Sequence, residues 1–243
     1  MDDDRSFLYG DGLFETVRVE KGQVRFLDHH RARLRRSASV LGFAEGRVEE
    51  ACRLLGAPAG LDGLWRVTIS RDGEGVAFGG SGRVSARWRG GLPELSAPRL
   101  VTMQGFYFPG DALAEHKTTS WLRSVELRRR AQQQGFDDGI GVSPDLRVGE
   151  CSAANLFVLN GEGWMTPPVD GLLPGVTRAA ILQRAAARGL VMEECEVTLE
   201  VLRGARAVAL SSAGLGVVGA SAVDGRKLDP TLVDELKVLL EGW

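Results

Sequence analysis

The chain has 243 residues, of which 44% are hydrophobic and 26% charged, as is typical of a soluble globular protein with one large or two smaller domains. Its formal net charge of −2 is not the basic excess that usually accompanies nucleic-acid binding. No apolar run approaches the roughly 20 residues of a membrane-spanning helix, and the first residues lack the basic and apolar regions of a signal peptide. We therefore expect a cytoplasmic protein with neither a nucleic-acid nor a membrane partner.

Cysteine and histidine are scarce in this chain. The three cysteines, at positions 52, 151 and 195, are odd in number and lack metal-type spacing, so we interpret them as reduced thiols. The three histidines, at positions 29, 30 and 116, are too few for a His-rich metal site. We expect no metal in this protein.

The N-terminal part of the chain alternates between strand and helix patterns. Gly10-Asp11-Gly12 forms a turn signal before an alternating, β-branched stretch, and Lys21-Gly22 forms a second turn. Asp28 is a plausible N-cap for a helix that ends at Gly42. The predicted strands are 13–19, 24–27, 64–70, 83–89 and 98–104, and the predicted helices are 28–41 and 47–55.

The C-terminal part continues with mixed elements. The patterns predict helices at 121–134 and 176–188, which end at Gly135 and Gly189, and a final helix from residue 230. Strands are predicted at 139–143 and 155–159, with a hairpin at 160–163 and a strand, a short helix and two more strands within 191–223. This mixture indicates an α+β fold. We expect an N-terminal domain at 1–104, a linker at 105–111 and a C-terminal domain at 112–243.

Lysine is rare in this chain, where arginine is the usual cation. Lys21 and Lys227 lie in turns and Lys237 on a terminal amphipathic helix, so these three are expected to be solvated. Lys117, the fourth lysine, has no such explanation beyond a helix start. Because an amine can lose its proton and a guanidinium cannot, Lys117 is a candidate for covalent chemistry with an aldehyde.

A carboxylate and a helix start follow Lys117 along the chain. Glu150 taken alone is an ordinary solvated glutamate, but a carboxylate beside a pyridine nitrogen favours its protonated, electron-accepting form. Leu173-Pro174-Gly175 opens a helix whose first N–H groups and Thr177 hydroxyl suit a phosphate, although a plain loop with a proline has the same pattern. Together the three features suit a phosphorylated aldehyde with a pyridine ring.

Five segments, in this order, resemble the motifs of the class IV aminotransferase family of pyridoxal-phosphate enzymes, and the resemblance covers nearly the whole chain. They are Tyr9-Gly10-Asp11-Gly12-Leu13-Phe14-Glu15-Thr16-Val17-Arg18, Phe26-Leu27-Asp28-His29-His30-Arg31-Ala32-Arg33-Leu34, Lys117, Glu150 with Asn155 in a Glu-x-x-x-x-Asn pattern, and Val176-Thr177-Arg178. The resemblance implies a fold type IV enzyme with a small N-terminal α/β domain and a larger C-terminal α/β pseudo-barrel domain. It also implies a homodimer.

The same resemblance implies pyridoxal 5'-phosphate as the cofactor and assigns roles to individual residues. Lys117 matches the Schiff-base lysine and later proton acceptor, and Glu150 matches the partner of the pyridine nitrogen. Lys117 and Glu150 are therefore the implied catalytic residues. The implied cofactor-binding residues are Arg33, Lys117, Glu150, Asn155, Val176, Thr177, Ser211, Ser212 and Gly214.

The particular residues within and near the motifs resemble those of the aminodeoxychorismate lyase branch of the family. The supporting segments are residues 10–16, His116-Lys117-Thr118-Thr119, and Thr166-Pro167-Pro168 followed by 171–175. In that branch the enzyme eliminates pyruvate from 4-amino-4-deoxychorismate and gives 4-aminobenzoate for folate synthesis. His116 is expected to be a structural neighbour of the lysine, and Cys151 a packing residue.

Two other functions stay open. Class IV aminotransferases for branched-chain amino acids usually have Gly where this chain has Thr16, and Tyr where it has Leu122; those for D-amino acids use an Arg-x-His trap, where this chain has Val76 and Phe78. A homologue that keeps the cofactor without catalysis is the other alternative. Candidates for binding substrate carboxylates are Arg66, Arg71 and the backbone N–H groups of 211–214.

Overall fold

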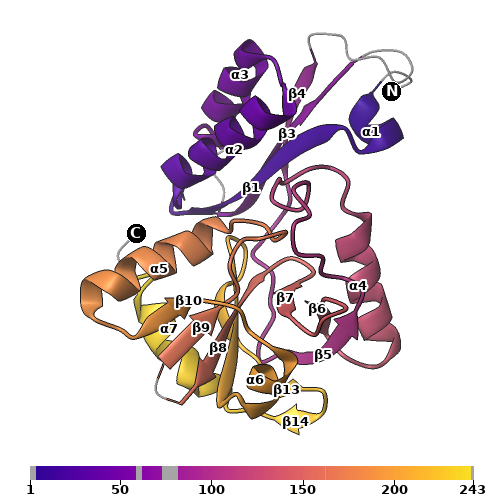
Figure 1. The fold of residues 1–243 in the computed structure, drawn as a ribbon. Helices are drawn as coiled ribbons and strands as arrows, with labels where there is room; N and C mark the ends of the chain where they lie inside the picture. Colours follow the sequence, from indigo (N-terminus) through magenta and orange to yellow (C-terminus); the bar gives the residue numbers. More distant parts are fainter. Residues whose placement is uncertain (1–3, 59–61, 73–81, 162, 242–243) are drawn as a thin grey trace. The chain divides into compact units, whose positions relative to one another are not determined.

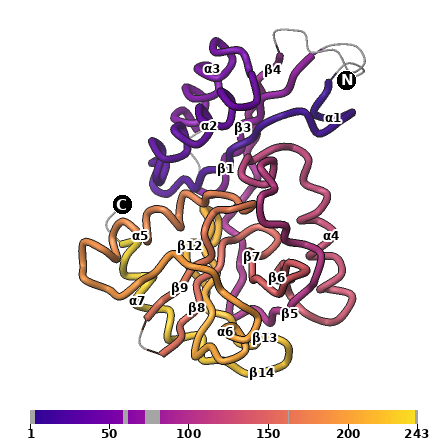
Figure 2. Tube along the Cα trace, viewed as in Figure 1, coloured from indigo at the N-terminus to yellow at the C-terminus, as the bar shows by residue number. Residues whose placement is uncertain are grey.

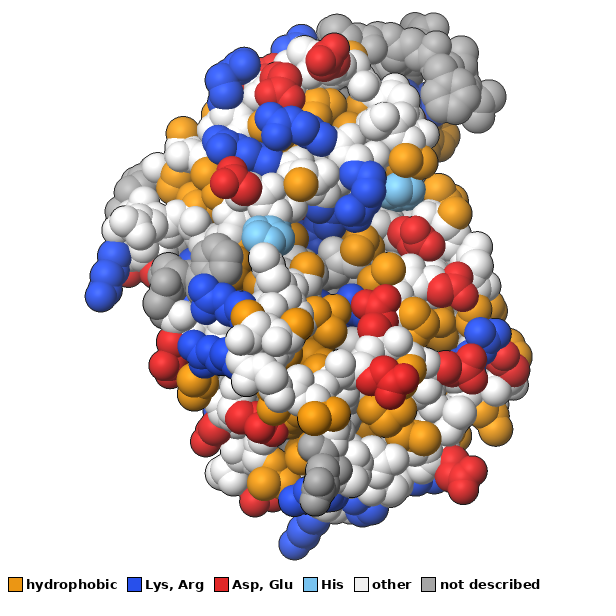
Figure 3. Space-filling view, turned by 60° about the vertical axis from the view of Figure 1, so that its left-hand side comes forward, with side chains coloured by type: hydrophobic (Ala, Val, Ile, Leu, Met, Phe, Trp, Pro, Cys, Tyr) orange, Lys and Arg blue, Asp and Glu red, His pale blue; other side chains and the backbone are white. Residues whose placement is uncertain are grey.

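The structure, a computed structural model, describes residues 4–58, 62–72, 82–161 and 163–241. The chain divides into two compact units: residues 1–93 with 116–121 form the first, and residues 94–115 with 122–243 form the second. No helix in the described part of the chain is both long and apolar enough to cross a membrane. Basic, acidic and hydrophobic side chains are interspersed on the face seen in Figure 3.

The first unit is an antiparallel sheet with two helices on one face (Figure 1). Its strands lie in the order β2-β1-β3-β4. The elements are α1 (Arg5–Tyr9), β1 (Gly12–Glu20), β2 (Gln23–Val24), α2 (Leu27–Leu41), α3 (Glu45–Leu55), β3 (Gly63–Ser70) and β4 (Arg83–Trp88).

The side chains of β1 alternate between two faces with different surroundings. Leu13, Val17 and Val19 are almost fully buried and pack with apolar side chains of α2 and α3. Because successive residues of a strand point to opposite faces, Phe14 and Thr16 lie on the other face. Both helices thus cover the odd-numbered face of β1, and the even-numbered face is left for other contacts.

The segment that carries Lys117 is held by β1 of the first unit. The backbone N–H of Phe14 donates to the carbonyl oxygen of Lys117 at 2.9 Å, and the N–H of Thr119 donates to the carbonyl of Gly12 at 2.8 Å. Leu13 and Thr118 form an antiparallel bridge between these bonds. Lys117 therefore occupies a short strand-like segment fixed by main-chain hydrogen bonds.

The second unit contains two five-stranded sheets, in the orders β10-β9-β8-β11-β12 and β14-β13-β5-β6-β7. The path of the chain from residue 94 to the C-terminal part can be followed in Figure 2. The strands of this unit are β5 (Arg99–Gln104), β6 (Asp138–Val142), β7 (Val148–Cys151), β8 (Asn155–Asn160), β9 (Gly163–Thr166), β10 (Met192–Glu194), β11 (Ala207–Ser212), β12 (Gly216–Gly219), β13 (Ala222–Val223) and β14 (Arg226–Lys227). Its helices are α4 (Leu122–Gln133), α5 (Val176–Arg188), α6 (Leu199–Gly204), the 3-10 helix η1 (Pro230–Val233) and α7 (Asp234–Val238).

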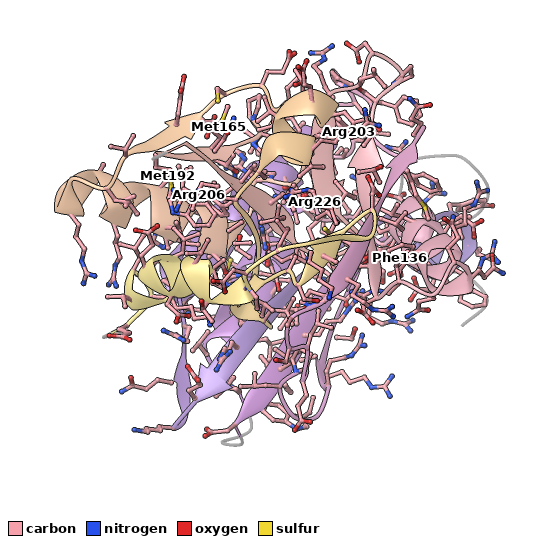
Figure 4. All side chains as sticks on the ribbon, turned by 90° about the horizontal axis from the view of Figure 1, so that it is seen from below. Phe136, Met165, Met192, Arg203, Arg206 and Arg226 are labelled. Atoms are coloured by element: carbon pink, nitrogen blue, oxygen red, sulfur yellow. The ribbon has the colours of Figure 1, made fainter. Side chains whose placement is uncertain are left out.

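Both sheets of the second unit contribute to one apolar core. Leu100 and Ile140 from one sheet cluster with Leu156 and Leu210 from the other, and all four are at most 1% exposed. At the end of the unit seen in Figure 4, Arg226 donates from Nη2 to the carbonyl of Ala205, at 2.8 Å, just after α6 ends. A cation at this position satisfies a carbonyl that the helix leaves unpaired.

Most predicted elements are present within one or two residues of their predicted ends, and the helix at 176–188 is confirmed at both ends. One capping prediction was wrong. Asp28 lies in the first turn of α2, and Phe26, in the left-handed conformation with φ 54°, is the N-cap. The short helix α1 had no counterpart among the predicted elements.

The predicted boundary between the two parts of the chain differs from the division in the structure. Strand β5 was assigned to the N-terminal domain, but it pairs in parallel with β6 and with β13, which both belong to the second unit. The chain therefore passes into the second unit near residue 94, before the expected linker at 105–111. It returns to the first unit for residues 116–121.

Candidate active site

Glu150 and Asn155 are joined by hydrogen bonds in the second unit. The Asn155 side-chain amide donates from Nδ2 to Oε2 of Glu150 at 2.8 Å and to the carbonyl of Leu173 at 2.9 Å. The N–H of Leu173 donates to the other carboxylate oxygen, Oε1, at 3.3 Å. Both oxygens of Glu150 thus accept hydrogen bonds, which fix the plane of this carboxylate.

The local sequence explains why these residues meet. Glu150 lies near the end of β7 and Asn155 begins β8, with a tight turn closed by a 2.9 Å bond from Cys151 N–H to the Ala154 carbonyl. Leu173 lies two residues before Gly175, the N-cap of α5. The turn between β7 and β8 and the loop before α5 therefore bring Glu150, Asn155 and the backbone of Leu173 together.

Close packing at the start of α5 requires a glycine at position 175. A Cβ there would overlap the side-chain oxygen of Asn155. The φ of Gly175 is −64°, so its backbone conformation is open to any residue and the requirement is one of space alone. Without a side chain, the backbone that enters α5 lies directly against Asn155.

Two buried hydroxyl groups in the second unit have no hydrogen-bond partner among the described residues. Thr177, in the first turn of α5, is 2% exposed, and Ser211, on β11, is 1% exposed; both Oγ atoms are unpartnered. Ser211 lies opposite Asn155 in the register of β8 and β11. Leaving such a group unsatisfied costs about 1–3 kcal/mol, so a ligand with acceptor oxygens fits this position.

The remaining residues expected in the phosphate site have more limited roles. The Val176 side chain is 5% exposed and apolar, so only its backbone N–H at the start of α5 is suited to bind an anion. Ser212 uses its Oγ to accept from the Leu215 N–H at 3.2 Å, which closes the turn after β11. Gly214 belongs to this same turn.

Lys117, in the first unit, lies against aromatic rings. Its Nζ is 4.7 Å from the centre of the Phe14 ring and 4.6 Å from that of Trp121. The two rings meet edge to face, with centroids 5.4 Å apart. An ammonium group is attracted to the faces of such rings, which therefore restrict where the half-buried amine lies.

Arg33 is fixed by a buried carboxylate on the covered face of β1. Its Nε and Nη2 donate to the two oxygens of Glu15, each at 2.7 Å, and His30 Nδ1 is 2.7 Å from the same carboxylate. All three residues are at most 6% exposed. The guanidinium is therefore oriented by two parallel hydrogen bonds, the strongest geometry for such a pair.

The two titratable partners of Arg33 have shifted pKa values. Burial alone raises the pKa of Glu15, but the charges and hydrogen bonds of Arg33 and His30 outweigh burial, and the net pKa lies well below the ordinary value. Burial lowers the pKa of His30, only partly offset by Glu15. Glu15 is thus an anion at neutral pH and His30 a neutral imidazole.

Helix α2 also contacts the segment that carries the lysine. Ser37, one turn beyond Arg33, has its Oγ 3.0 Å from Nδ1 of His116. Since His116 is 9% exposed and adjacent to Lys117, this contact anchors the segment beside α2. The expected role of His116 as a neighbour of the lysine agrees with this position.

Each unit thus holds part of the expected set. Lys117 and Arg33 belong to the first unit; Glu150, Asn155, Val176, Thr177, Ser211, Ser212 and Gly214 belong to the second. Val76 and Phe78 lie outside the described residues. The pairing of Glu15 with Arg33 was not predicted, although a glutamate among the inward apolar residues of a strand indicates a buried charge.

The sequence pattern of the family "Amino-transferase class IV" matches residues 12–223. The chain belongs to this family. Among curated relatives, a D-alanine aminotransferase of Bacillus licheniformis is 27% identical, over 93% of this chain and 83% of that protein. A bifunctional aminodeoxychorismate lyase and D-amino acid transaminase of Mycobacterium tuberculosis is also 27% identical, over 96% and 89% of the two chains.

Solved structures of family members share the fold. A putative 4-amino-4-deoxychorismate lyase from Legionella pneumophila superposes with a TM-score of 0.87 at 26% identity and covers 98% of this chain and 92% of its own. The fold IV-transaminase CpuTA1 of Curtobacterium pusillum gives 0.83 at 27% identity, over 100% and 90%. A hypothetical aminotransferase of M. tuberculosis in its PLP-bound form gives 0.84 at 25%, over 99% and 91%. The fold of the present chain is therefore fold type IV, as expected.

Proposed function

We propose that this protein is a pyridoxal 5'-phosphate enzyme and that its reaction is the elimination of pyruvate from 4-amino-4-deoxychorismate, which gives 4-aminobenzoate for folate synthesis. One observation carries the cofactor assignment: the hydrogen-bonded Glu150–Asn155 pair lies opposite the hydroxyl of Ser211 and at the start of the helix that holds Thr177, and neither hydroxyl has a partner within the described part of the chain. The group fits a molecule that has both a ring nitrogen and a phosphate.

The residues divide the work of holding the cofactor between them. Thr177 and Ser211 would donate their free hydroxyls to phosphate oxygens, together with the first N–H groups of α5 and the turn that contains Ser212 and Gly214. Arg33 would add a fixed positive charge. Bound pyridoxal phosphate would supply an aldehyde that takes up amines and a ring that accepts electrons.

Glu150 would hold a proton on the pyridine nitrogen of the cofactor. Its carboxylate is oriented by Asn155 and by the Leu173 N–H. An anion held in a fixed position favours the protonated state of a nearby base. Loss of Asn155 would leave the charge of Glu150 in place but release its orientation.

Lys117 would act first as the amine that holds the cofactor and then as a base. With a substrate amine bound at the site, the neutral Nζ of Lys117 would accept the proton from the amine-bearing carbon of the substrate. The aromatic rings of Phe14 and Trp121 limit the volume in which this nitrogen moves. In the lyase reaction the electrons of the broken carbon–hydrogen bond would form a ring double bond as the carbon–oxygen bond to the enolpyruvyl group breaks. The leaving group would depart as the enolate of pyruvate, which takes up a proton, and aromatisation of the ring supplies driving force.

The lyase proposal is supported by the wording of residues 10–16, 116–119 and 166–175 and by the lyases among the similar proteins. Transamination of D- or branched-chain amino acids is the second candidate, favoured by the D-alanine aminotransferase of B. licheniformis. Both reactions need the same proton transfer by Lys117. Residues that hold the cofactor therefore do not separate them.

The cofactor assignment is tested by borohydride reduction of the protein loaded with pyridoxal phosphate. We expect reduction to fix the cofactor on Lys117, detected as a mass increase in the peptide that contains it, and Lys117→Ala to lack the label. The matched control Lys237→Ala, which changes an exposed lysine of α7, should label as the wild type does. Labelling elsewhere, or none, would contradict the role of Lys117.

The reaction is tested by two assays on the same preparation. We expect 4-aminobenzoate and pyruvate from 4-amino-4-deoxychorismate, and Lys117→Ala to reduce the rate by at least about 10²-fold, because it removes the base. Formation of 2-oxo acids from a panel of D- and L-amino acids, with no 4-aminobenzoate, would assign the protein to transamination. Label on Lys117 with neither product would identify a non-catalytic homologue.

We further propose that the protein acts as a homodimer in the cytoplasm. Three consecutive large side chains of α1, Phe7, Leu8 and Tyr9, are 74%, 47% and 51% exposed, and such a group favours a protein contact. All three cysteines are free, which suits a reducing compartment. Light scattering coupled to size exclusion, with Phe7→Asp beside the wild type, tests the dimer.

A further inference from the structure

One arginine of the first unit stands apart from the rest. Arg66, on β3, is half-buried and has no carboxylate partner among the described residues. The other arginines of the described first unit either form ion pairs, as Arg5, Arg18, Arg25, Arg31, Arg33, Arg35, Arg47 and Arg71 do, or are exposed to water, as Arg36, Arg53, Arg83, Arg87 and Arg89 are. Arg66 is thus a guanidinium with reduced hydration and no counter-charge from the described part of the chain.

The position of Arg66 places it beside the reactive amine. Arg66 lies opposite Thr16 in the register of β1 and β3, on the face of the sheet that α2 and α3 do not cover. Its Cζ is 3.6 Å from the centre of the Phe14 ring, and the Nζ of Lys117 is 4.7 Å from the same centre. One aromatic ring therefore supports both cations.

The Arg66 guanidinium is oriented by one hydrogen bond, and its other donors have no partner among the described residues. Its Nε donates to Oγ1 of Thr68, two residues along β3, at 3.3 Å, and its two Nη groups have no partner among the described residues. Burial, with the like charge of Arg89, lowers the pKa of Arg66. Both effects disfavour the cation in the absence of a ligand, and an anion would relieve them.

Arg71, the other candidate for binding a carboxylate, is already engaged. It donates from Nη1 to Asp11 at 2.6 Å and from Nη2 to the carbonyl of Leu41, and its Cζ stacks 4.0 Å from the Phe43 ring. These contacts tie the start of β1 to the end of α2. Of the two arginines, Arg66 is the one whose Nη groups have no partner among the described residues.

We propose that Arg66 binds a carboxylate of the substrate through its Nη groups and thereby selects amines that carry a carboxylate. The inference rests on the proposed function, because it assumes that the substrate amine reaches Lys117. The fork of two N–H donors matches the two oxygens of a carboxylate, and the fixed Nε–Thr68 bond presets its plane. Arg66 would therefore be a specificity-determining residue of this site.

The test measures binding of amines with and without a carboxylate to the protein loaded with pyridoxal phosphate. Isothermal titration calorimetry compares D- and L-alanine with ethylamine, and 4-aminobenzoate with aniline. We expect the wild type to prefer the carboxylate-bearing member of at least one pair. Arg66→Gln should reduce that preference by roughly ten- to hundred-fold, the range for a hydrogen bond to a charged group.

Two further variants separate binding from folding. Arg66→Lys keeps the charge without the fork, so we expect it to retain only part of the preference. Arg87→Gln is the matched control, because Arg87 pairs with Arg66 in the register of β3 and β4 but is exposed, and it should leave the preference unchanged. Circular dichroism confirms that each variant is folded; if Arg66→Gln is not, Arg66→Lys decides.

Three outcomes would overturn the inference. The first is that the wild type shows no preference for the carboxylate-bearing amines, and the second is that Arg66→Gln (or Arg66→Lys, if Arg66→Gln is unfolded) leaves the preference unchanged. The third is that the variant loses equal affinity for the amines with and without a carboxylate. Borohydride labelling of Lys117 in the wild type is measured in parallel. Its absence would contradict the proposed function. Normal labelling together with an unchanged preference would contradict the role of Arg66 alone.

Discussion

At the scale of single residues, the buried Glu15 carboxylate balances the charge of Arg33 on the face of β1 that the helices cover, and the stability of the first unit depends on it. It accepts both hydrogen bonds of Arg33 and contacts His30. We predict that Glu15→Gln lowers the free energy of unfolding by about 3–5 kcal/mol, because it leaves the Arg33 charge buried without its counter-ion. The control Glu49→Gln, which breaks an exposed pair with Arg35, should cost less than about 1 kcal/mol.

Urea unfolding at several pH values gives a second reading of the same variant. Because the pKa of Glu15 is lowered in the folded state, the unfolded chain binds the proton more tightly, and the stabilisation by Glu15 is lost as the pH falls below about 4. The wild type should therefore lose stability more steeply than Glu15→Gln in this acid range. Parallel curves for the two proteins would contradict a depressed pKa for Glu15.

At the scale of elements, the start of α5 depends on the absence of a side chain at Gly175. We predict that Gly175→Ala displaces Asn155, costs about 1–3 kcal/mol as overpacking does, and weakens binding of pyridoxal phosphate. Gly46→Ala in α3, where a Cβ would meet no atom within 4 Å, should be neutral or stabilising by up to about 1 kcal/mol. Thermal unfolding and a cofactor titration compare the two; equal effects would refute the packing requirement.

At the scale of the whole molecule, the Thr177 hydroxyl, which no other described residue binds, links folding stability to the cofactor. Saturation with pyridoxal phosphate at about 100 times its dissociation constant should stabilise the wild type by roughly 2.7 kcal/mol. Thr177→Val removes the hydroxyl at nearly constant shape, so we predict equal or higher stability without the cofactor and a smaller gain with it. Thermal unfolding with and without pyridoxal phosphate measures both the stability of the variant and its gain on binding the cofactor. A lower stability of Thr177→Val than of the wild type without the cofactor would show that the hydroxyl already has a partner.

Much of this molecule follows from its sequence alone. The alternation of β1, the Pro-Gly entry into α5 and the short spacing from Glu150 to Asn155 act over a few residues, so hydrophobic period and turn chemistry predict them. The same local motifs indicated the family that residues 12–223 now establish.

Other features were decided only by the tertiary structure, because they join residues far apart in the chain. Glu15 meets Arg33 across 18 positions, and His116 meets Ser37 across 79. The placement of Lys117 beside β1 depends likewise on strand register. So does the difference between Arg71, which pairs with Asp11, and Arg66, which has no carboxylate partner among the described residues. A local pattern can indicate a buried charge, as at Glu15, but it does not identify the partner, since the partner comes from a distant part of the chain.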